Sequence, residues 1–182
     1  MHPALNHTEF NDFNRNSNES ISICLVARRH PMKGLATFVD VWEKLELEQK
    51  RKIKRVIMIS HDDLSTFDTT SFDIIVPKSD NDVADVYRLA DIFISTSWWE
   101  GFGLPPLEAM ACGCAVICSK SGGVNEYAID NYNCIMFEPK DENGLKNCLL
   151  EMINNENKSI SAITREIIDS ATTLPLIATQ VS

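Results

Sequence analysis

The feature that most constrains this chain is a regular alternation of short apolar runs with segments of helical periodicity. The runs lack the alternation of apolar and polar residues that a half-solvated sheet shows, and helical segments separate them. Strands of this kind are buried on both faces, as in a parallel sheet covered by helices. The sequence therefore predicts a Rossmann-like three-layer α/β/α domain with a parallel sheet. Strands are expected at 21–27, 55–60, 72–77, 91–96, 115–119 and 134–137, and helices at 34–48, 83–90, 105–112, 123–128, 142–154 and 159–170.

Composition divides the chain into three parts. Residues 1–20 include five asparagines and no apolar period, which is typical of a polar linker or the ragged start of a domain. The predicted domain occupies residues 21–170. Residues 171–182 contain Pro175 and no clear helical period, so they are expected to form a C-terminal tail.

Charge and hydropathy exclude several classes of protein. The chain has 17 Lys and Arg residues against 26 Asp and Glu, a formal charge of −9, which argues against nucleic acid as a partner. No apolar run approaches the roughly 18 residues of a membrane span, and the N-terminus lacks the features of a signal peptide. We therefore expect a cytoplasmic protein.

The six cysteines are expected to be reduced thiols that pack as small hydrophobic residues. Most of them lie inside apolar segments such as ISICLVA and AVICS, so a disulfide framework is not predicted. Cys112, Cys114 and Cys118 lack the paired spacing of a structural zinc site. No metal site is predicted.

The loop after the first predicted strand is a candidate anion site. It carries Arg28, Arg29, Lys33 and Gly34 immediately before a predicted helix. Backbone N–H groups, the helix dipole and the cationic side chains all favour negative charge at such a position. The alternative is a solvated basic turn, which this loop alone does not exclude.

A second loop, residues 95–108, joins a predicted strand to a helix and holds two carboxylates. Gly101 and Gly103 allow the backbone to approach a ligand closely. Glu100 precedes the helix and Glu108 lies one turn inside it, where a carboxylate also stabilises the helix without any ligand. Two carboxylates also suggest a glycosidase pair, but that mechanism needs no neighbouring cationic loop. The cations favour a phosphate-bearing ligand.

These residues carry a resemblance to a known family. The segment from Glu100 to Glu108, EGFGLPPLE, followed by Gly122 and Gly123, resembles glycosyltransferase family 4, the group 1 glycosyltransferases. Arg28 and Lys33 match the diphosphate-binding Arg and Lys of this family, although Ala27 stands where a glycine is usual. The likeness extends from about residue 21 to about residue 170.

The resemblance implies a GT-B architecture, in which two Rossmann-like domains enclose the active site. This chain resembles only the C-terminal, donor-binding domain. The N-terminal domain, which supplies acceptor contacts, has no counterpart here, so either the chain is truncated or a partner chain supplies it.

The resemblance also implies roles for the two loops. Arg28 and Lys33 would hold the donor diphosphate and neutralise the leaving group, and Glu100 would face hydroxyls of the donor sugar, which makes these three the candidate catalytic residues. Glu108 would accept hydrogen bonds from both ribose hydroxyls. Backbone groups of the intervening segment would complete the cradle, and the donor-binding residues expected there are Gly101, Phe102, Gly103 and Leu104.

The implied reaction is transfer from a nucleotide-diphosphate sugar to a sugar or lipid-linked acceptor, with retention of anomeric configuration. Family members need no bound metal, and Asp62-Asp63 lacks the spacing of a donor-metal motif, so no cofactor is expected. Polysaccharide biosynthesis is one expected context, and the whole enzyme could associate with the inner face of a membrane.

Two other functions fit the same motifs. One is a synthase of storage or compatible sugars, which only acceptor assays would distinguish. The other is a non-catalytic module that binds a nucleotide sugar but lacks the acceptor domain. Trp98 and Trp99 are predicted to pack between helices more readily than to stack on a sugar, and residues 76–78 are the expected neighbours of the nucleotide base.

Overall fold

The sheet is parallel throughout, as the sequence predicts. The structure is a computed structural model, and it describes residue 9 and residues 21–154. Almost all of the predicted linker 1–20, the predicted helix 159–170 and the predicted tail 171–182 lie outside the described residues. The strands lie in the order β3-β2-β1-β4-β5-β6, and each neighbouring pair is parallel. Their bounds are β1 Ile21–Val26, β2 Ile53–Ile59, β3 Asp73–Ile75, β4 Ile92–Ser95, β5 Ala115–Ser119 and β6 Ile135–Phe137.

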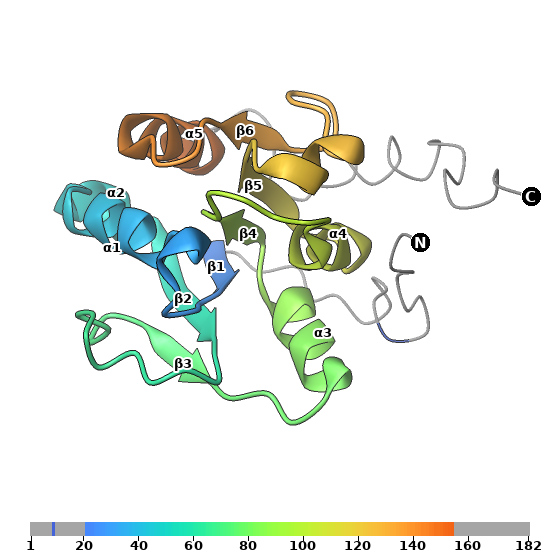
Figure 1. Cartoon of the computed structure of the whole chain (residues 1–182). Helices are drawn as coiled ribbons and strands as arrows, with labels where there is room; N and C mark the ends of the chain where they lie inside the picture. The colour runs from blue at the N-terminus through green and yellow to red at the C-terminus, as the bar shows by residue number, and fades with distance from the viewer. Residues whose placement is uncertain (1–8, 10–20, 155–182) are drawn as a thin grey trace, which may run out of the picture.

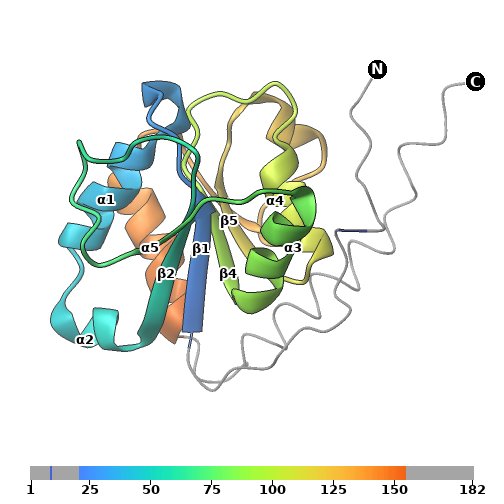
Figure 2. The same ribbon diagram turned by 90° about the horizontal axis from the view of Figure 1, so that it is seen from below.

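Helices cover both faces of the sheet, which completes the three layers (Figure 1; Figure 2). Helices α1 and α5 pack together on one face, whereas α3 and α4 pack together on the other. The α-helices are α1 Leu35–Glu43, α2 Leu47–Arg51, α3 Asp80–Leu89, α4 Leu104–Ala111 and α5 Glu142–Asn154. Two short 3₁₀ helices, η1 Pro31–Lys33 and η2 Gly122–Glu126, lie in loops.

Each central strand divides its side chains between two hydrophobic cores. In β1, Ile23 and Leu25 join the core under α1 and α5, while Cys24 joins the core under α3 and α4. In β5, Ile117 and Cys118 divide in the same way. Burial on both faces explains why these strands are continuous apolar runs in the sequence.

Two predicted helices differ from the structure. The segment 34–48 forms α1 and α2 with a break between them, because Leu45 turns into the core and a new capping box begins at Glu46, whose N–H donates to Gln49 Oε1 at 3.0 Å. The segment 123–128 is not an α-helix but the 3₁₀ helix η2, which begins at Gly122.

A third helix begins earlier than predicted. Helix α3 begins at Asp80, three residues before the predicted start, because the Ser79 side chain caps it by accepting a hydrogen bond from Asp82 N.

All six cysteines are buried and free. Within residues 21–154 and at residue 9, no group of three His, Cys, Asp or Glu side chains is placed to hold a metal ion. None of the helices in this part of the chain is both long and apolar enough to cross a membrane.

Candidate active site

The strand order creates a crevice between the loops that follow β1 and β4. These strands are neighbours, but the chain continues from β1 to β2 on one side and from β4 to β5 on the other. In open parallel sheets, ligands bind at such a switch point, beyond the carboxyl ends of the strands. A cavity here is lined by residues of both loops, among them Arg28, Lys33, Ser97, Glu100 and Pro105. The fold thus brings together the three candidate catalytic residues.

Lys33 and Glu100 form the centre of this site. The Lys33 ammonium lies 2.8 Å from Glu100 Oε1 and 3.0 Å from Oε2. The Ser97 hydroxyl donates to Oε1 at 2.6 Å. With 16% of its side chain exposed, Glu100 is well shielded from water, so its charge needs these partners. Ser97 is a site residue that the sequence reasoning did not single out, although it lies in the loop that carries the motif.

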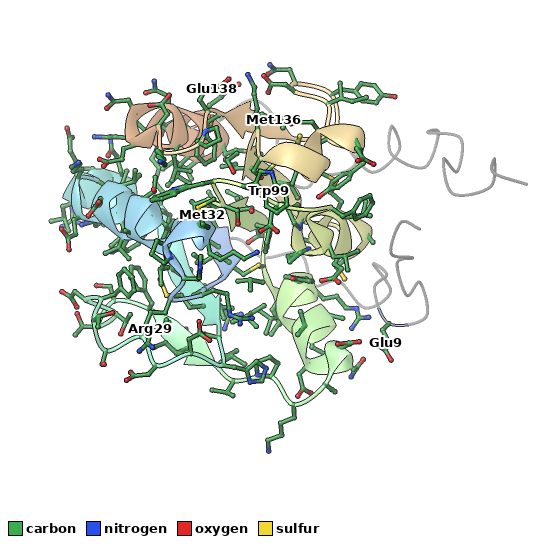
Figure 3. All side chains as sticks on the ribbon, viewed as in Figure 1. Glu9, Arg29, Met32, Trp99, Met136 and Glu138 are labelled. Atoms are coloured by element: carbon green, nitrogen blue, oxygen red, sulfur yellow. The ribbon has the colours of Figure 1, made fainter. Side chains whose placement is uncertain are left out.

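Hydrogen bonds to the backbone fix the two loops relative to each other. Trp98 N donates to Met32 O at 2.7 Å, and Thr96 Oγ1 donates to Lys33 O at 3.1 Å. Figure 3 labels one residue of each loop, Met32 in the first and Trp99 in the second. Because hydrogen bonds flank the ion pair, the backbone holds Lys33 within reach of Glu100.

A third loop, after β5, closes against the Glu100 loop. Gly123 N donates to Glu100 O at 3.0 Å, and a Cβ at position 123 would lie 2.0 Å from Gly101 O. The chain can therefore pass this close only with glycine at position 123. The Gly122-Gly123 pair has low helix propensity and Gly122 has φ +62°, which disfavours the predicted α-helix and leaves the 3₁₀ turn η2.

Arg28 is paired with a carboxylate that the sequence reasoning did not assign to the site. Its Nε lies 3.2 Å from Asp62 Oδ2, and the same oxygen accepts a hydrogen bond from Arg29 N at 2.7 Å. The bond from Arg29 N, together with the positive charge of Arg28, holds the pKa of Asp62 below its usual range. The position of Asp62, directly after a predicted strand, is the sequence feature that could have indicated it. That strand, β2, lies beside β1 in the sheet.

Glu108 lies on α4 and is turned toward α3. Its Oε2 accepts a hydrogen bond from Tyr87 Oη at 3.4 Å. Burial raises the pKa of Glu108, although the Tyr87 bond opposes this. The structure does not place Glu108 among the residues that line the cavity of Lys33 and Glu100. Its role toward a ribose stays a prediction.

The segment between the two glutamates starts α4. Gly103 has φ +79° and is the N-cap of the helix, and Leu104 is its first residue. Tyr127 fixes this turn, since its hydroxyl donates to Gly103 O and its ring lies 5.5 Å from that of Phe102. Gly101 has open space where a Cβ would be. The expected contacts of these four residues with a donor stay predictions.

The two tryptophans have different surroundings. The Lys140 ammonium lies 4.1 Å from the centre of the Trp98 ring, a cation–π contact that occupies one face of the indole. Trp99 is 62% exposed. The expectation that both pack between helices therefore fails for Trp99.

Comparison with known proteins identifies the family. The sequence model described as "Glycosyl transferases group 1" matches residues 7–167. The chain belongs to this family. Among group 1 relatives, an uncharacterized glycosyltransferase of Methanocaldococcus jannaschii is 30% identical over 134 residues, which is 69% of this chain and 36% of that protein. Sucrose-phosphate synthase of Spinacia oleracea is 26% identical over 158 residues, or 74% of this chain and 15% of the synthase. The chain thus spans about a third or less of these two relatives.

Solved structures of glycosyltransferases share the fold. The C-terminal domain of a group 1 glycosyltransferase, LpcC of Francisella tularensis, has a TM-score of 0.74 and 25% identity, covering 94% of this chain and 98% of that one. Anabaena HepE in complex with UDP and glucose has a TM-score of 0.68 and 18% identity, covering 84% of this chain and 44% of that one. The fold is therefore that of the C-terminal domain of a GT-B glycosyltransferase.

Proposed function

We propose that this chain is the donor-binding domain of a retaining, metal-independent glycosyltransferase that uses a nucleotide-diphosphate sugar. The observation that carries the proposal is the meeting of Arg28, Lys33 and Glu100 in one cavity at the switch point of the sheet. Membership of the group 1 family supports it, as does the UDP complex of HepE, which shares the fold.

The reaction replaces one bond of the anomeric carbon by another. The bond from this carbon to the diphosphate oxygen breaks, the acceptor hydroxyl oxygen bonds to the same carbon, and the hydroxyl proton leaves with the nucleoside diphosphate. Negative charge grows on the diphosphate as the first bond breaks. Arg28 and Lys33 stabilise that charge electrostatically, the work that a metal ion performs in other transferases.

Glu100 orients the donor sugar. In the structure its two oxygens face Lys33, and Oε1 also faces Ser97. Binding of the donor transfers part of the Lys33 charge to the diphosphate, which releases carboxylate lone pairs to accept hydrogen bonds from sugar hydroxyls. The assignment of retention rests on the family alone.

The acceptor is a sugar or a lipid-linked sugar held by the other GT-B domain. The M. jannaschii relative is almost three times as long as the matched segment, which leaves room for such a domain in proteins of this family. Synthesis of surface polysaccharide, with the enzyme at the inner face of a membrane, is the setting we favour.

A second candidate is a module that binds a nucleotide sugar without transferring it. The observation in its favour is that the matched segment is only 36% of the M. jannaschii relative. Binding without transfer or hydrolysis would distinguish the module from the enzyme.

The proposal is tested by calorimetric titration of the 182-residue chain in metal-free buffer with UDP, GDP and ADP, followed by the glucose ester of each. We expect one diphosphate and its sugar ester to bind. If none of the six compounds binds, the proposal is wrong. Glu108→Ala should weaken that binding, and parental affinity in this variant would remove the ribose role.

A further inference from the structure

Hydrogen bonds at both ends hold Asp62 beside Arg28, the cation that we assign to the diphosphate. Its backbone N–H donates to Ser60 Oγ at 3.0 Å, and Ser60 is buried and continues the pairing of β2 with β3 through a bond from its N–H to Ile75 O. At the other end, Asp62 Oδ2 accepts hydrogen bonds from Arg29 N and Arg28 Nε. The carboxylate is thus fixed next to Arg28.

The contact between Arg28 and Asp62 leaves the two terminal nitrogens of the guanidinium accessible to a ligand. Asp62 engages Nε, and in the described part of the chain the two terminal nitrogens, which carry four of the five N–H donors, have no protein partner. A phosphate can bind to these nitrogens while Asp62 stays in place. The carboxylate then lies within the Debye length of about 8 Å from that phosphate.

Asp62 has two opposite effects on a bound diphosphate. It orders an exposed Arg28 side chain, and an exposed ion pair of this kind changes an equilibrium constant by at most about fivefold. It also repels the diphosphate, because like charges that lie within the Debye length repel each other near a protein surface. Ordering of Arg28 acts alike on every ligand that binds its terminal nitrogens, whereas repulsion grows with the charge of the ligand.

The two ligands of the reaction differ in charge. In a nucleotide sugar, the terminal phosphate is esterified and has one ionisable oxygen fewer than in the free nucleoside diphosphate. The second ionisation of a terminal phosphate has a pKa of about 6, so the free diphosphate carries almost one additional negative charge at pH 7. That additional charge develops at the phosphate from which the sugar has left.

We propose that Asp62 is a specificity-determining residue of the diphosphate site, which disfavours the free nucleoside diphosphate relative to the nucleotide sugar. The proposal rests on the proposed function, because it concerns the same site. Its consequence for turnover is that the carboxylate promotes release of the product after transfer.

The test compares Asp62→Asn with Asp63→Asn by calorimetric titration of the whole chain with UDP and UDP-glucose, or with the GDP or ADP pair if the parent binds one of those. Asp63 is a matched control, since it is adjacent and loses the same charge but bonds to Ser65 N instead of Arg28. We expect Asp62→Asn to increase affinity for the nucleoside diphosphate three- to tenfold more than affinity for the nucleotide sugar. Asp63→Asn should change that ratio less than twofold.

Other outcomes overturn the proposal. An unchanged ratio in Asp62→Asn, or equal weakening of both ligands, would mean that Asp62 only positions Arg28. The same ratio change in both variants would show a general effect of net charge. Asp62→Glu keeps the charge and should keep the parental ratio, which guards against a folding defect in the Asn variant. Failure of the parent to bind any ligand overturns the proposed function as well, whereas binding with an unchanged ratio overturns this inference alone.

Discussion

Gly34 lies directly against the backbone of Thr96. A Cβ at position 34 would stand 2.0 Å from Thr96 O, and Gly34 has φ +65°, a conformation that L-residues rarely adopt. This contact lies next to Lys33 in one loop and near Glu100 in the other. The absence of a side chain at position 34 therefore sets how closely the two halves of the site approach.

Gly34→Ala should destabilise the chain and disturb the site. Strain at positive φ and the clash with Thr96 together should lower the free energy of unfolding by at least about 2 kcal/mol, measured by chemical denaturation. Gly101→Ala is the control, because a Cβ there has no neighbour within 4 Å, and it should stay within about 0.5 kcal/mol of the parent. Equal stability of the two variants would refute the packing role of Gly34.

Lys33→Ala should weaken binding of the nucleoside diphosphate. The loss of binding free energy should be about 1.5 to 3 kcal/mol, the range for a hydrogen bond to a charged group. Glu100 also loses its cation in this variant, so its carboxylate repels the ligand. Calorimetric titration measures the affinity. Lys52→Ala removes the same charge just before β2, at the opposite end of the sheet, and should bind as the parent does. Diphosphate affinity that is insensitive to Lys33 would remove the first loop from the site.

Glu108 should make stability depend on pH in a direction unusual for a carboxylate. Burial raises its pKa in the folded state, so the folded protein holds this proton more tightly than the unfolded chain does. The resulting stabilisation is complete below the pKa of the unfolded chain and is lost as pH rises through the raised pKa. Glu108→Gln cannot titrate. The free energy of unfolding of the parent should therefore fall relative to this variant as pH rises above about 4. If the difference in free energy of unfolding between the parent and Glu108→Gln stays constant with pH, or changes in the opposite direction, the burial of this carboxylate is contradicted.

Leu149→Ala should produce a large loss of stability. Leu149 is fully buried on α5 in the core shared with α1, and truncation of such a side chain leaves a cavity that costs about 2 to 5 kcal/mol. Leu47→Ala on α2 is the matched control, because Leu47 is 64% exposed, and it should change the free energy of unfolding by less than about 0.5 kcal/mol. Comparable losses in the two variants would mean that α5 does not pack on the sheet as described.

Local pattern was enough to predict the elements and their layers. A run such as Ile21–Val26 is apolar at every position except Ser22, and the Pro105-Pro106 pair predicts the start of α4 to within one residue. These features depend on residues close together in the chain, so the sequence alone predicts them. The motif from Glu100 to Glu108 likewise identifies the family without any coordinates.

Tertiary structure alone decided which side chains meet. Lys33 and Glu100 are 67 positions apart, and Arg28 and Asp62 are 34 apart. No periodicity encodes these pairs, because they depend on the strand order that places the ends of β2, β1 and β4 side by side. The same long-range packing broke the predicted helix at Leu45, since burial of Leu45 outweighs local helix propensity. The sequence by itself therefore determined the layers, the parallel sheet and the family. Contacts between distant segments decided how each cation of the site is paired.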